Sequence, residues 1–186
     1  MITSKKIQDD EIELKNLKLG DEFSEYLSWM NNDLITQYLE VRFEKSINAE
    51  SLKKFVELTN ESKNSILFGI FLKKNNIHIG NIKLDVNLFH NRGEIGLLIG
   101  NRSYWGKGFA SKAINLISDY AFNNIKLIKL TAGCYENNVG SIKAFLNAGF
   151  EIEANLKSHW SFKKERQRGV LLAKFNLEKN INESRK

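Results

Sequence analysis

Residues 94–110 read EIGLLIGNRSYWGKGFA, and this stretch decides the fold. It predicts a strand over residues 94–99, a polar connection, and a glycine-rich turn that opens a helix. The first amides of a helix have no intrahelical acceptor and point outward with the positive end of the helix dipole. Gly106 and Gly108 let a ligand approach this backbone closely, so the turn is a candidate phosphate site.

The spacing of these glycines disfavours two common nucleotide-binding loops. The GxxxxGK[ST] pattern of ATP-binding loops is absent, and the GxGxxG pattern of NAD-binding folds fails because Ser111 stands where the third glycine would be. The following helix should run to about residue 122, with Ser118 on its polar side. Its predicted apolar face consists of Ala110, Ala113, Ile114, Ile117 and Ala121.

A second strand–loop–helix unit follows about 30 residues later. Residues 127–134 have the composition of a buried strand, and residues 137–150 read NNVGSIKAFLNAGF. Helical spacing places Asn138, Ser141 and Phe145 on one stripe of the predicted helix. The strand over 94–99, the helix that follows it and the strand over 127–134 therefore predict a strand–helix–strand crossover in the middle of the chain.

The remaining segments predict an α/β fold of α+β type that is antiparallel at its start. The expected elements are a strand over 12–17, helices over 23–30 and 48–61, a hairpin of strands 65–72 and 77–86, and two strands after residue 150. The apolar positions change parity at Gly80, which indicates a bulge or a close backbone approach there. With no repeat and no Gly/Ser linker, residues 1–186 are expected to form one domain.

Composition narrows the class of protein further. The 186 residues are 42% hydrophobic, enough to bury a core, and the single cysteine and three histidines predict neither a disulfide nor a metal site. Neither a signal peptide nor a membrane span is evident, so we expect a cytoplasmic location without membrane contact. The net charge of +6 is concentrated after residue 155, where nine basic residues meet three acidic ones. This tail predicts either a solvated hairpin or attraction for an acidic substrate.

Taken together, residues 94–110 and 137–150 resemble the GNAT superfamily of acyl-CoA-dependent N-acetyltransferases. Within it, the chain is most similar to the branch of the ribosomal-protein serine/alanine acetyltransferases. The resemblance implies a central, twisted, mixed but mostly antiparallel sheet of about seven strands with about four flanking helices. It also divides the chain into a cofactor-binding core at about 93–150, an acceptor-side wall at about 21–62 and basic C-terminal strands at 150–178.

The resemblance implies acetyl-CoA as co-substrate and assigns residues to it. In the family, backbone amides of a Q/R-x-x-G-x-G/A turn hold the pyrophosphate, and a strand pairs with the pantetheine arm. Trp105 departs from the usual Gln or Arg, which removes one side chain but no amide, and Lys107 or Lys112 is a candidate to supply charge. The predicted cofactor-binding residues are Leu97, Leu98, Ile99, Trp105, Gly106, Lys107, Gly108, Phe109, Ala110, Asn138, Ser141 and Phe145.

The usual catalytic residues of the family carry over less well. Phe145 stands where many relatives have a tyrosine that protonates the leaving thiolate, and Gly133 stands where some have a glutamate. Ser141 is our candidate acid and Glu94, which shares strand parity with Leu98, our candidate base. Alternatives are a purely structural Ser141 or Glu94, the loop histidines 90 and 159 as bases, and a thiolate that leaves unassisted.

The acceptor is the least determined part. Glu40 and Arg42 lie in the acceptor-side wall and are candidates to hold an amine and a phosphate, or else a surface ion pair. We expect N-acetylation of a primary amine by direct transfer, with a nucleotide-linked amino sugar or a ribosomal-protein N-terminus as acceptor, and a polyamine or an aminoglycoside-like amine behind them. The alternatives are a catalytically weak acyl-CoA-binding module and a nucleic-acid binder acting through residues 157–168. We expect no direct nucleic-acid contact, and leave a homodimer open.

Overall fold

The computed structural model describes residues 7–17, 21–44 and 46–176. Residues 177–178, the end of the predicted C-terminal strands, and both chain ends lie outside this description, as does residue 45 of the predicted acceptor-side wall. The helices are α1 (Asp21–Met30), α2 (Asp33–Thr36), η1 (Glu40–Phe43), α3 (Ala49–Glu61), η2 (Arg102–Tyr104), α4 (Phe109–Tyr120), the π-turn η3 (Ala121–Ile125) and α5 (Val139–Asn147). The strands are β1 (Ile7–Gln8), β2 (Ile12–Asn16), β3 (Ser65–Leu72), β4 (His78–Asn87), β5 (Arg92–Ile99), β6 (Lys129–Tyr135), β7 (Glu151–Phe162) and β8 (Glu165–Phe175).

The strands form one mixed sheet in the order β1-β2-β3-β4-β5-β6-β8-β7. Every neighbouring pair is antiparallel except β5 and β6, which run parallel because α4 connects them as a crossover. This confirms the predicted mixed, mostly antiparallel fold. The described residues contain eight strands and five α-helices, one more of each than expected.

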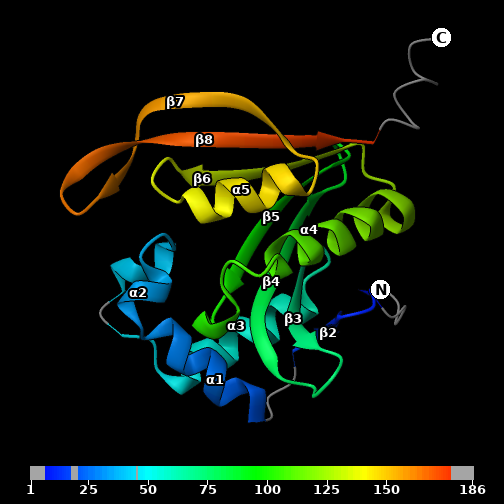
Figure 1. Cartoon of the computed structure of the whole chain (residues 1–186), viewed down its shortest axis with the longest axis vertical. Helices are drawn as coiled ribbons and strands as arrows, with labels where there is room; N and C mark the ends of the chain where they lie inside the picture. Colours follow the sequence, from blue (N-terminus) through cyan, green and yellow to red (C-terminus); the bar gives the residue numbers. More distant parts are fainter. Residues whose placement is uncertain (1–6, 18–20, 45, 177–186) are drawn as a thin grey trace.

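Helices cover both faces of the sheet (Figure 1). On β3, Ile66, Phe68 and Ile70 belong to the core beneath α4 and α5, whereas Leu67 points to the other face and packs with α1 and α3. Since successive side chains of a strand alternate between faces, a strand covered on both sides must be apolar at nearly every position. This explains the continuous apolar run of β3.

The parity change at Gly80 reflects both features that the sequence predicts. Ile70 pairs with Gly80 but Phe71 pairs with His78, so one extra residue bulges out of β4 beside the glycine. A Cβ on Gly80 would stand 2.2 Å from the Leu98 carbonyl oxygen, which makes glycine necessary. The bulge shifts the face to which the rest of β4 presents its side chains.

Helix α4 departs from the prediction at one position. Ser118, expected on the polar face, is fully buried, and its Oγ donates a hydrogen bond to the Ile114 carbonyl oxygen at 2.7 Å. A serine that bonds the preceding turn needs no water and can be buried.

Among the described residues, no helix has the length and apolar character needed to cross a membrane.

Candidate active site

The two parallel strands separate after three residues. Arg92, Gly93 and Glu94 of β5 pair with residues 129–131 of β6, but β5 continues to Ile99 without pairing further with β6. Figure 1 shows the two strands diverging from this point. The facing edges therefore offer backbone amides and carbonyls to an extended ligand inserted between them.

The glycine-rich turn lies at the open end of this gap. Gly106 and Gly108 have φ values of 71° and 83°, in the left-handed region that favours glycine, and nothing lies within 4 Å of a Cβ built on either. Gly108 is the N-cap of α4 and contributes no side-chain capping bond, so the first-turn amides of the helix have no side-chain partner there. Open space before these amides suits an anion such as a pyrophosphate.

Trp105 anchors the turn to the strand. Its indole Nε1 donates a hydrogen bond to the Ile99 carbonyl at 2.6 Å while 43% of the residue stays exposed. The residue that replaces the family's Gln or Arg thus fixes the turn relative to β5. Of the two nearby lysines, Lys112 is ion-paired with Glu11, and Lys107 lies 5.5 Å from the centre of the Tyr104 ring.

Helix α5 follows directly from β6, the other strand of the gap. The Asn138 side chain caps it by accepting a hydrogen bond from the Ser141 amide at 3.3 Å through Oδ1, so its Nδ2 donors are not used in the cap. Phe145 is 2% exposed and packs edge-on against Phe150. Of the predicted stripe, Asn138 and Ser141 are therefore more accessible than Phe145.

The Ser141 hydroxyl lies beside the thiol of Cys134. The two side-chain atoms, Oγ and Sγ, lie 3.3 Å apart. Burial raises the pKa of the Cys134 thiol, and the hydrogen bond with Ser141 opposes this shift. The protonated thiol can donate to the Ser141 oxygen, which leaves the hydroxyl proton available to another acceptor.

Glu94 stands where the gap begins, as the last β5 residue that pairs with β6. Its side chain is exposed and shares one face of β5 with Gly96 and Leu98, and Leu98 packs on the α1 and α3 side. With a rise of about 3.3 Å per residue, Glu94 lies roughly 7 Å from Gly96 along the strand. It can therefore serve a reaction beside Gly96 directly or through a bridging water.

Arg42 is held by the chain itself. Its guanidinium donates hydrogen bonds to the carbonyls of Gln37 and Ser161 at 2.7 Å and to the Tyr135 hydroxyl at 2.6 Å. It also lies 4.8 Å from the centre of the Tyr135 ring. Arg42 thus joins the acceptor-side wall to β6 and β7, while Glu40 at the start of η1 is exposed.

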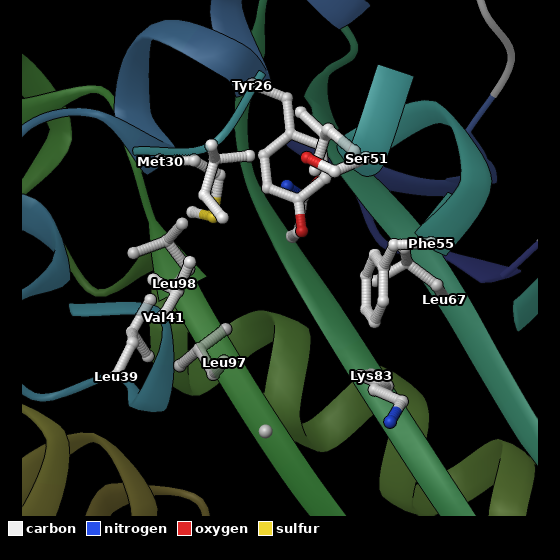
Figure 2. A pocket seen from close by; sticks show the side chains of 14 residues that line it. Tyr26, Met30, Leu39, Val41, Ser51, Phe55, Leu67, Lys83, Leu97 and Leu98 are labelled. Atoms are coloured by element: carbon white, nitrogen blue, oxygen red, sulfur yellow. The ribbon is translucent and has the colours of Figure 1, made fainter. Parts of the chain in front are cut away.

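A cavity of about 350 Å³ opens beside β5 on the face covered by α1 and α3. Gly96, Leu97 and Leu98 line it, so it adjoins the strand edge predicted to receive the cofactor. In the predicted acceptor-side wall, Leu39 and Val41 line the cavity, whereas Glu40 and Arg42, the residues chosen from the sequence, alternate with them. Figure 2 shows the side chains of Leu39, Val41, Leu97 and Leu98 around the hollow.

The polar residues of the cavity lining are not predicted from the sequence, and Asn81 and Tyr26 are the two buried ones among them. Asn81 of β4 and Tyr26 of α1 both line the cavity. Burial raises the pKa of Tyr26 to about 12, because ionisation would place a charge away from water. The bulge next to Gly80 is the one sequence signal that points near Asn81; nothing in the sequence distinguishes Tyr26 from an ordinary core residue of an amphipathic helix.

The predicted loop histidines 90 and 159 stand apart from the cavity lining. Within residues 7–17, 21–44 and 46–176, no three His, Cys, Asp or Glu side chains group closely enough to hold a metal ion.

Comparison with known proteins adds the family context. Residues 12–151 match the family model described as "Acetyltransferase (GNAT) domain". The chain is 26% identical over 152 residues to an uncharacterized N-acetyltransferase, p20, of Bacillus licheniformis, a match that covers 81% of this chain and 84% of that protein.

Solved structures share the fold, among them two acetyltransferases. An acetyltransferase of the GNAT family from Bacillus anthracis superposes with a TM-score of 0.79 at 21% identity, covering 92% of this chain and 98% of that one. Spermidine N-acetyltransferase from Vibrio cholerae, solved with CoA and spermine, gives a TM-score of 0.77 at 23% identity over 90% of this chain and 96% of that one.

Proposed function

Since this chain belongs to the GNAT acetyltransferase family, as an acetyl-CoA-dependent acyltransferase, we propose that its acceptor is a primary amine acetylated by direct transfer. The observation that carries the proposal is the gap between β5 and β6, with the open glycine turn at one end and the cavity beside it. This arrangement can bring a thioester and an amine together without a covalent enzyme intermediate. We also propose that the protein is cytoplasmic and that residues 1–186 form a single domain.

The glycine turn supports a role in holding the pyrophosphate of acetyl-CoA. The amides of Gly108 and of the first α4 turn would bind its oxygens, and the free edge of β5 at Leu97–Ile99 would pair with the pantetheine arm. Asn138 has Nδ2 donors left for the same ligand. The thioester would then lie beside the cavity that Gly96 and Leu98 line.

The chemistry needs few groups from the protein. The neutral amine nitrogen attacks the thioester carbonyl carbon, a C–N bond forms, the C–S bond breaks, and the sulfur leaves as a thiolate. The nitrogen loses one proton, for which Glu94 is the proposed acceptor, and the thiolate gains one, for which Ser141 is the proposed donor. Backbone amides of the β5 edge are the proposed donors to the tetrahedral oxyanion.

Of the acceptors expected from the sequence, an α-amine at a polypeptide N-terminus is better supported than an amino sugar. Sugar hydroxyls buried against apolar walls would lose their hydrogen bonds to water, and the cavity walls are mostly aliphatic. Arg42, the candidate phosphate ligand for a nucleotide-linked sugar, already uses three of its donors within the chain.

A two-step measurement tests the proposal. The protein is titrated with acetyl-CoA and with desulfo-CoA in a thermal-shift assay, and CoA release is then followed with a panel of amines. We expect both nucleotides to raise Tm with concentration and at least one amine to release CoA. Absence of any shift would contradict the phosphate-binding turn, and a shift without turnover on any amine would support an acyl-CoA-binding module instead.

A further inference from the structure

The cavity between the sheet, α1 and α3 has the character of a site for an apolar group. Most of its wall is aliphatic, with Met30, Leu39, Val41, Leu52, Leu67 and Leu98 among its residues. Its volume of about 350 Å³ lies at the small end of the range for ligand pockets, about 300–1,000 Å³. It therefore suits one compact apolar substituent, which would gain free energy on leaving water.

One buried residue of the cavity lining has an unpaired side-chain donor. Asn81 lines the cavity and is 4% exposed, and its Nδ2 has no hydrogen-bond partner among the described residues. Its Oδ1 lies 2.8 Å from Nε2 of the buried His78, which fixes the orientation of the amide. A buried donor left unpaired is destabilising, so a hydrogen bond from Nδ2 to a ligand oxygen would be favourable.

The charge of the lining restricts the ligand further. No carboxylate belongs to the described residues that line the cavity, and its one cation, Lys83, is ion-paired with Asp85 at 2.9 Å. In Figure 2 the Tyr26 hydroxyl points into the hollow, and Lys83 lies toward its other end. A ligand with a second ammonium group, such as a polyamine, would find no counter-ion on these walls.

We propose that this cavity binds the acceptor and selects a primary α-amine whose carbon carries a bulky apolar side chain and a carbonyl group. The side chain fills the aliphatic hollow, and the carbonyl oxygen accepts a hydrogen bond from Asn81 Nδ2. The amine then lies toward Gly96, Leu97 and Leu98, next to the thioester. The inference rests on the proposed acetyltransferase function; its substrate class is the amide of an apolar α-amino acid or a peptide that begins with one.

The acceptor panel tests the selectivity directly. CoA release from acetyl-CoA is measured for the full-length protein with L-leucinamide, L-phenylalaninamide, glycinamide, glucosamine and spermidine. Because burial of a large aliphatic side chain is worth a factor of about ten or more, kcat/KM for L-leucinamide should exceed that for glycinamide by at least about tenfold. The tripeptide Leu-Gly-Gly, compared with L-leucinamide, shows whether a peptide N-terminus or a free amino-acid derivative is preferred.

Asn81→Asp tests the polar anchor, since the carboxylate keeps an oxygen for His78 and replaces the Nδ2 donor by an acceptor. KM for L-leucinamide should rise about tenfold or more, while the acetyl-CoA thermal shift is unchanged. Asn75→Asp is the matched control, because Asn75 lies in the exposed turn between β3 and β4, and its Oδ1, which accepts from the Ile77 amide, is kept in the variant. KM for L-leucinamide should not change in this control.

A second variant covers the case in which the buried carboxylate of Asn81→Asp prevents folding. Ser51 is an exposed residue of α3 that lines the cavity, so Ser51→Phe can fill the hollow without burying a charge. The preference for L-leucinamide over glycinamide should collapse in Ser51→Phe. A preference that survives this variant would overturn the inference.

The outcomes separate the inference from the function on which it rests. Acetylation of spermidine or glucosamine in preference to the apolar amides would overturn the proposed acceptor class and leave the acetyltransferase intact. A normal KM for Asn81→Asp would overturn the role of the amide. Loss of both the acetyl-CoA thermal shift and all turnover would refute the acetyltransferase proposal itself, and the acceptor class with it.

Discussion

Substitution of Gly108 by alanine should separate the stability of the turn from its binding of acetyl-CoA. Gly108 has a φ of 83°, and nothing lies within 4 Å of the added Cβ, so the variant meets no clash in the free protein. The left-handed conformation costs a residue with a Cβ about 1–2 kcal/mol. For a domain of this size that cost lowers Tm by roughly 2–8 °C, which leaves the protein folded at 25 °C.

The effect on binding should be larger. The new methyl group stands in the open space before the first amides of α4, where the pyrophosphate is expected. Loss of one hydrogen bond to a charged group costs about 1.5–3 kcal/mol, which corresponds to a rise in the Kd of acetyl-CoA of about 10- to 150-fold. Isothermal titration calorimetry measures this Kd directly.

Gly149→Ala provides the matched control. Gly149 has a φ of 79°, and its nearest neighbour to an added Cβ is the Lys174 side chain at 3.6 Å, an ordinary van der Waals distance. The control should lose a similar amount of stability, because its backbone strain is the same, and should bind acetyl-CoA as the wild-type does. An unchanged Kd for Gly108→Ala would refute the phosphate-site reasoning, and an equal loss of affinity in both variants would show that backbone strain alone is responsible.

Three further predictions concern protonation and catalysis. Ser141→Ala should lower kcat by about tenfold or more and alter the pH profile of kcat, because its hydroxyl is the proposed proton donor; an unaltered profile would remove that role. Phe145→Tyr should retain activity and bind acetyl-CoA normally in calorimetry, although the buried new hydroxyl beside Phe150 should reduce Tm in a thermal melt. The Tyr26 pKa of about 12, against an ordinary value of 10.0, predicts stability that is intact below pH 10 and lost as the pH rises toward 12, because the unfolded state ionises first. Tyr26→Phe should flatten this alkaline loss, which amounts to roughly 2–3 kcal/mol, in urea unfolding curves measured across that range. An equally steep loss in the variant would assign it to other groups.

The sequence predicts those elements whose causes are local. Strand β3 matches its predicted bounds, Ser65–Leu72, because a continuous apolar run between polar residues marks the extent of a strand that is covered on both faces. Asn48 caps α3 as expected, through a bond from the Ser51 amide to its Oδ1 at 2.7 Å. The two-residue strand β1 has no such local signal and depends on pairing with β2, so the sequence does not predict it.

Local sequence patterns do not predict features that depend on pairing between distant segments. The parting of β5 from β6 follows from a register of three pairs that no local pattern encodes. In the acceptor-side wall, Glu40 and Arg42 are chosen from the sequence because they are charged. In the structure their neighbours Leu39 and Val41 line the cavity instead. Asn81 is a candidate ligand-binding residue because the fold buries its Nδ2 without a partner among the described residues and places its Oδ1 beside His78.

The weak provision for proton transfer and the proposed acceptor class support one another. Glu94 lies where the paired part of β5 and β6 ends, the Ser141 hydroxyl is hydrogen-bonded to the Cys134 thiol, and the Phe145 side chain has no proton to donate. An α-amine has a pKa of about 7.7–8.0, so roughly a tenth of it is neutral at pH 7, whereas a lysine-like amine with a pKa of about 10.4 is neutral in only about one molecule in 2,500. A thiol pKa of about 8.5 likewise makes the thiolate a good leaving group, so a weak donor such as Ser141 is sufficient. A site with few groups for proton transfer therefore suits an α-amine better than a lysine-like amine, because a larger fraction of the α-amine is already neutral. The apolar walls and the Asn81 donor favour the same class of acceptor for binding.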